Sequence, residues 1–134
     1  MSDSMDNKYA LFRGCVIPVQ VPFIEKLAGE LLPMLGIAIE NLDFSCCPYN
    51  AVRDVNEEDW LAIGARNLAL AEKKNMKILS LCNGCFQTLI EANDILKNDS
   101  IVLKRVNTKL ERIGLNYAGT AQVVHFMMLL DEKK

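Results

Sequence analysis

The sequence has little of what marks a nucleic-acid-binding or a membrane protein. Its 134 residues include 15 lysines and arginines and 17 aspartates and glutamates, for a formal net charge of −2. Nucleic-acid binding calls for a clustered basic face, which this balance does not indicate. No apolar run approaches the roughly 20 residues of a membrane-spanning helix, and the longest run near the end, 123–130, is interrupted by His125. The sequence therefore predicts neither a nucleic-acid partner nor a membrane span.

We expect residues 1–8 not to be a secretory signal, because they are polar and acidic. We therefore expect a cytoplasmic protein. Structural disulfides are rare in that reducing compartment, so five cysteines in a chain of this size indicate metal binding or catalysis. The odd number argues further against a closed disulfide framework. The alternative is that all five are buried as small apolar side chains.

Short apolar runs alternate with helical periodicities along the chain. Residues 1–7 are expected to form a frayed tail ahead of one domain, 8–134. We expect strands at 9–12, 37–42, 76–81 and 122–124. Helices are expected to start at Pro22, near Asn56, after Cys82 and at Ile101. This alternation predicts an α/β fold: a single Rossmann-like domain with a small parallel sheet flanked by helices.

Apolar stripes suggest which helix faces are buried. In the first helix the expected apolar face contains residues 23, 27, 31 and 35, with 24, 28 and 32 beside them, and Pro33 should kink or end the helix. In the helix 101–113 the expected buried stripe is Val102, Val106, Leu110 and Ile113. Residues 127–130 are expected to be helix core, or a partner surface if a second domain is missing.

Four of the cysteines follow expected strands directly. These are Cys15, Cys46, Cys47 and Cys82, while Cys85 lies one helical turn after Cys82. In a parallel sheet, functional residues gather where strands end and loops lead into helices. The spacing therefore predicts that the five cysteines meet at one edge of the sheet.

The chemistry of five converging thiols favours a centre with several metal ions. Cys82-Asn83-Gly84-Cys85 is expected to open a helix, whose unpaired amides and positive dipole end stabilise thiolates. Adjacent cysteines in an extended segment point to opposite sides, which suits a cluster of several irons better than one ion. Zn²⁺ closes its shell with four ligands and stays the alternative metal. A metal-free thioredoxin-like dithiol at Cys82 and Cys85 would leave the other three cysteines unexplained.

Five segments of the chain resemble the cysteine-rich CCG domain found in the B subunit of heterodisulfide reductase, in the order of its N-terminal half. They are 9–18 (YALFRGCVIP), 44–48 (FSCCP), 60–68 (WLAIGARNL), 81–86 (LCNGCF) and 124–126 (VHF). Two features depart from the family pattern. Pro48 follows the cysteine pair where the motif's name has glycine, and the chain stops where the full subunit would enter its second cysteine-rich domain.

The resemblance implies a non-cubane [4Fe–4S] cluster held by Cys15, Cys46, Cys47, Cys82 and Cys85. It also implies an oxidoreductase subunit that reduces a small thiol/disulfide substrate, and that needs a second CCG domain, on a partner or in a homodimer. An iron–sulfur ferredoxin-like subunit and a flavoprotein are the implied electron-transfer partners. The alternative is a zinc-stabilised or cluster-bearing binding or electron-transfer module whose catalytic site lies on a partner, for example in a hydroxy-acid oxidase complex.

Five further residues are candidates to surround the cluster. Arg13 could steer an anionic thiol or offset cluster charge, although a surface ion pair is the alternative. Asn83 could donate a hydrogen bond to a sulfur, or serve only the turn. Gly14 permits a tight turn, and Gly84 lets backbone N–H groups approach sulfur. His125, the single histidine, is either part of this site or a packing residue.

Overall fold

The computed structural model describes residues 8–12, 22–42, 44–45 and 50–133. It contains a four-stranded sheet of β1 (Lys8–Phe12), β2 (Ala38–Glu40), β3 (Lys77–Ser80) and β4 (Val123–His125), in the order β2-β1-β3-β4. All three pairs of neighbouring strands are parallel. The four expected strands are therefore confirmed, with β2 shorter than predicted.

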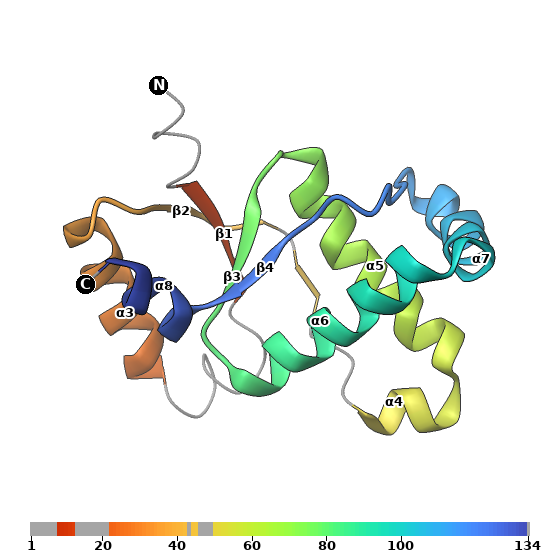
Figure 1. Ribbon diagram of the computed structural model, residues 1–134, viewed down its shortest axis with the longest axis horizontal. Helices are drawn as coiled ribbons and strands as arrows, with labels where there is room; N and C mark the ends of the chain where they lie inside the picture. Colours follow the sequence, from red (N-terminus) through yellow and green to blue (C-terminus); the bar gives the residue numbers. More distant parts are fainter. Residues whose placement is uncertain (1–7, 13–21, 43, 46–49, 134) are drawn as a thin grey trace.

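Helices cover both faces of the sheet (Figure 1). On one face lie α3 (Pro22–Met34) and α8 (Phe126–Lys133), which share a core with Leu11 and Leu79. On the other face lie α5 (Glu57–Lys73) and α6 (Asn83–Asn98), with α7 (Ser100–Leu110) packed against both. Their core includes Phe12, Trp60 and Ile78. This arrangement confirms the predicted α/β class, and the strands are mostly apolar because both faces are covered.

The direction of winding reverses between β1 and β3. From β1 the chain passes through α3 to β2 at the edge, and it then returns past β1, through α5, to β3 and β4. In open parallel sheets the ligand site lies beyond the carboxyl ends of the strands at this reversal. Phe12 and Ser80 are paired there, and Cys15 and Cys82 follow them in the sequence. The structure therefore places Cys82 next to the usual position for a site, while Cys15 lies outside the described residues.

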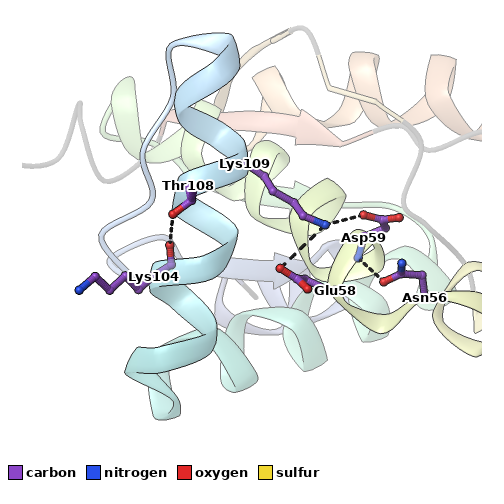
Figure 2. A network of polar contacts seen from close by, with 6 residues as sticks. All are labelled: Asn56, Glu58, Asp59, Lys104, Thr108 and Lys109. Atoms are coloured by element: carbon purple, nitrogen blue, oxygen red, sulfur yellow. Dashed lines mark hydrogen bonds and ion pairs between the residues drawn. The ribbon is translucent and has the colours of Figure 1, made fainter.

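The start of α5 follows from its sequence as predicted. Asn56 is the N-cap, and its side-chain oxygen accepts a hydrogen bond of 3.1 Å from the backbone N–H of Asp59. Lys109 of α7 reaches this first turn, with its Nζ 2.7 Å from Asp59 Oδ1 and 3.9 Å from Glu58 Oε1 (Figure 2). The hydrogen bond to Asp59 raises the pKa of Lys109. The first turn of α5 therefore anchors α7 at an exposed contact.

Only part of the apolar face expected on α3 is buried. Phe23 and Leu27 are 60% and 61% exposed, whereas Ala28 and Leu32 are buried. The buried face is turned by one residue, which lets the small Ala28 lie against the sheet. On α8, Met127 and Met128 are also exposed and Leu129 is buried, so only part of the predicted helix core is confirmed. The two helices thus leave apolar side chains on the surface.

Two other helix predictions need correction. Ile113 is exposed and not part of a buried stripe, because the chain leaves α7 through the 3₁₀ turn Glu111–Ile113 and then Gly114 with φ of 75°. A short helix, α4 (Asn50–Val55), forms where no helix was predicted. Pro33 lies in the last turn of α3, which ends at the next residue as expected.

Gly64 lies where α5 packs against α6, and a Cβ atom added there would lie 3.1 Å from Ala92 Cβ. We expect Gly64→Ala to lower the free energy of unfolding by about 1 to 3 kcal/mol, because the methyl group forces the helices apart. The measurement is urea unfolding. Gly29→Ala in α3 is the matched control, because no atom lies within 4 Å of its added Cβ.

The control should raise the free energy of unfolding by about 0.5 to 1 kcal/mol through higher helix propensity. Equal stability of the two variants would contradict a close helix contact at Gly64.

Candidate metal centre

Cys82 and Cys85 lie at the start of α6, one turn apart. Cys82 is the N-cap, with extended backbone and no side-chain capping hydrogen bond, and Cys85 is 4% exposed. The two are not joined to each other by a disulfide. Both sulfurs therefore belong to the positive end of a helix, which favours thiolates and the negative charge of a thiolate-held metal.

The backbone of Cys82 is held in place by its carbonyl oxygen. This oxygen accepts hydrogen bonds of 3.0 Å from the hydroxyl of Ser80 and 3.0 Å from the N–H of Phe86. Ser80 is buried at the end of β3. The hydroxyl therefore fixes the turn from strand to helix, while the thiol of Cys82 takes no part in that turn.

Gly84 lies beside the sulfur of Cys82. A Cβ atom at this position would lie 3.8 Å from Cys82 Sγ, in ordinary van der Waals contact. Steric crowding by a Cβ atom therefore does not explain the glycine, and the approach of its N–H to a sulfur stays a prediction. Asn83, the next candidate, is exposed in the first turn of α6.

Asn67 of α5 holds the residue that precedes the cysteine pair. It is fully buried, and its Oδ1 accepts hydrogen bonds of 3.0 Å from the backbone N–H and 3.2 Å from the hydroxyl of Ser45. Its Nδ2 donates a 3.4 Å bond to the Ser45 carbonyl. Sequence reasoning gave Asn67 no role. The available signal was an amide among the apolar residues of a helix, since a buried polar group requires partners.

The residues after the cysteine pair are also anchored to the helical layer. Arg53 of α4 forms an ion pair of 3.1 Å with Glu91 of α6, and its guanidinium lies 4.6 Å from the centroid of the Trp60 ring. In the sequence, Cys46 and Cys47 are therefore flanked on one side by the Asn67 contact and on the other by the helix α4.

His125 ends β4, where it pairs with Ser80. The backbone N–H of Met127 donates a hydrogen bond of 3.1 Å to His125 Nδ1. The rings of His125 and Phe86 pack edge to face, with their centroids 5.6 Å apart. Nε2 is buried, with no hydrogen-bond partner in the part of the chain that the structure describes.

The structure thus brings Cys82, Cys85, Asn83, Gly84 and His125 to the carboxyl edge of the sheet. Arg13, Gly14, Cys15, Cys46 and Cys47 lie outside the described residues, and their roles stay predictions. Within the described ranges, no group of three or more histidine, cysteine or acidic side chains could hold a metal ion. The donor set that is present, two thiols one turn apart at a helix start, fits part of a sulfur-ligated metal centre.

Comparison with known proteins agrees with this geometry. Residues 9–90 match the family model of the CCG cysteine-rich domain, and the chain belongs to that family. It is 40% identical over 125 residues to the B subunit of the ferredoxin/F420H2-dependent CoB-CoM heterodisulfide reductase of Methanosarcina acetivorans, covering 92% of this chain and 42% of the relative. A protein of Archaeoglobus profundus that is named as like the B subunit of heterodisulfide reductase is 36% identical, with the same coverage.

The chain is also similar to a subunit of another reductase and to a solved structure. The chain is 31% identical to the 8-methylmenaquinol:fumarate reductase membrane anchor subunit of Wolinella succinogenes, over 94% of this chain and 44% of that relative. A crystal structure of a hypothetical protein from Helicobacter pylori shares the fold, with a TM-score of 0.85 and 23% identity, over 94% of this chain and 25% of that one. This chain therefore spans less than half the length of each of these relatives.

The helices of the described residues are each too short or too polar to cross a membrane. A cytoplasmic location stays a prediction.

Replacing Asn67 by Ala should lower the free energy of unfolding by about 1 to 3 kcal/mol, because the backbone groups of Ser45 lose their buried partner. We also expect less metal bound per chain, since Ser45 directly precedes Cys46. Urea unfolding and metal analysis of the purified variant measure the two effects.

Asn98→Ala is the control, because the exposed Asn98 amide donates to the Asp94 carbonyl within its own helix. Its stability should stay within about 0.5 kcal/mol of the unmodified chain. If Asn67→Ala changes the free energy of unfolding equally little, Asn67 does not hold the segment at Ser45.

Proposed function

We propose that this chain is an iron–sulfur redox domain of a heterodisulfide-reductase-like complex, with a non-cubane [4Fe–4S] cluster held by its five cysteines. The observation that carries the proposal is the pair Cys82 and Cys85 at the start of α6, beside the reversal point of the sheet. The similarity to the B subunits of heterodisulfide reductases supports it. The cysteines Cys15, Cys46 and Cys47 complete the ligand set in this proposal.

The reaction would be reduction of a small disulfide. Cleavage of the S–S bond consumes two electrons and two protons and yields two thiols. The bound cluster would supply one-electron transfer and an iron position that a substrate sulfur can occupy. Electrons would come from a ferredoxin-like iron–sulfur subunit, itself supplied by a flavoprotein.

The chain's own residues would prepare the site for this chemistry. The first turn of α6 stabilises negative charge on the thiolates of Cys82 and Cys85. Ser80 and Asn67 hold the backbone at both cysteine segments before metal binds. Fixed ligands lose less conformational freedom on binding a cluster, which favours a single coordination geometry.

Turnover would require a second CCG domain, on a partner or in a second copy of this chain. The relatives are more than twice as long as this chain. Exposed apolar side chains on α3 and α8, which pack over the same face of the sheet, support an additional interface: Phe23, Leu27, Met34, Met127 and Met128. The electron-transfer partners would bind elsewhere on the completed assembly.

A second candidate function is electron transfer to a catalytic site on another chain. The similarity to a subunit of a fumarate reductase favours it, because that relative belongs to a reductase with a different substrate. In this alternative the same centre carries electrons and binds no disulfide. Adding a thiol substrate separates the two candidates, since only the first predicts a changed spectrum of the oxidised cluster.

Metal and acid-labile sulfide content decide the nature of the centre. After strictly anaerobic purification we expect about four irons with matching sulfide per chain. About one zinc without sulfide would contradict the proposal and indicate a structural or docking module instead.

Replacing Cys46 or Cys47 by Ser tests the adjacent ligands. Either change should abolish the intact cluster, because serine oxygen is a poor substitute for thiolate at iron. Asn98→Ala is the control, since the Asn98 amide bonds the Asp94 carbonyl of its own helix and the change keeps every thiol. Iron content and spectrum in the serine variants equal to those of the control would exclude these two ligands.

A further inference from the structure

His125 belongs to the last paired row of the sheet, and its neighbour in β3 is Ser80, two residues before Cys82. Phe12, Ser80 and His125 are successive partners across β1, β3 and β4. Ser80 in turn donates its hydroxyl hydrogen bond to the Cys82 carbonyl. The imidazole is therefore part of the carboxyl edge on which the proposed metal centre rests.

The hydrogen bond at Nδ1 determines which ring nitrogen carries the proton. Met127 donates its backbone N–H to His125 Nδ1 at 3.1 Å, so Nδ1 must present a lone pair. The ring proton then belongs on Nε2, which makes Nε2–H a hydrogen-bond donor. The edge-on contact with Phe86 further fixes the ring. His125 is thus an oriented neutral donor.

This donor is buried, and none of the described residues accepts from it. Folded proteins rarely leave a buried donor without an acceptor, because its lost hydration is not replaced. The Phe86 side chain that contacts the ring is apolar, and the Met127 N–H is itself a donor, so neither accepts from Nε2. The acceptor must therefore come from outside the described residues or from a bound group.

We propose that His125 Nε2–H donates a hydrogen bond to a sulfur of the thiolate-held centre. The inference rests on the proposed function, because it requires a sulfur-rich centre at this edge. His125 is then a positioning residue that also sets the reduction potential, and it transfers no proton to substrate. A hydrogen bond to sulfur stabilises the reduced centre, which carries more negative charge.

Loss of this donor should make the centre harder to reduce. In His125→Phe we expect the ratio of reduced to oxidised centre at a fixed ambient potential to fall on the order of tenfold, which corresponds to about 59 mV for one electron. His125→Gln keeps an amide N–H near the same position and should recover most of the shift. Anaerobic redox titrations of the two variants and the unmodified chain measure this, with iron content checked in each.

The single histidine allows a second measurement without any substitution. Growth with ¹⁵N-histidine labels only this residue. Pulsed electron paramagnetic resonance (EPR) of the oxidised cluster should then detect coupling to a nitrogen of His125. This measurement decides the question even if His125→Phe does not fold.

The outcomes separate the two proposals. An unmodified chain without iron and sulfide overturns the proposed function and this inference together. A normal iron–sulfur centre that shows no ¹⁵N coupling, and whose potential is unchanged in a folded His125→Phe, overturns the inference alone. Coupling together with a lowered potential that Gln restores supports it.

Discussion

Parallel pairing of β1 with β3 is the constraint on which the rest of the structure depends. Parallel strands cannot be joined by a tight turn, so each connection must cross the sheet as a helix. Because α3 crosses one face and α5 and α6 the other, the two central strands end side by side with their following loops diverging. In open parallel sheets ligands bind at such a reversal, and α6 begins at this edge with its positive end.

Buried polar side chains form hydrogen bonds at both edges of the sheet. Asn67 and Ser80 fix segments next to the cysteines at the carboxyl edge. At the opposite edge, Asn93 donates a 3.1 Å hydrogen bond to the Ala121 carbonyl ahead of β4 and accepts one from the Tyr117 hydroxyl. Burial raises the pKa of Tyr117, so its hydroxyl stays a donor. Asn67 and Asn93 thus use similar hydrogen bonds at the two edges of the sheet. Asn67 lies beside the candidate centre, and Asn93 is remote from it.

The predictable parts of the fold were those set by local chemistry. The strand runs, the Asn56 cap and the Cys82 helix start follow from neighbouring residues. The buried face of α3 did not, because its apolar residues surround more than half of the helix and the sheet contacts only one side. Helix α4 was also missed, since Arg53 stabilises it through Glu91 and Trp60 on other helices.

For the site, the sequence alone determined the thiols, their spacing and the family to which the chain belongs. These are properties of residue type and order along the chain. Only the tertiary structure assigned roles to Asn67, Ser80 and His125, because a hydrogen bond between residues far apart leaves no local pattern. A buried amide or imidazole requires partners, and the partners became known only when the strands and helices had packed.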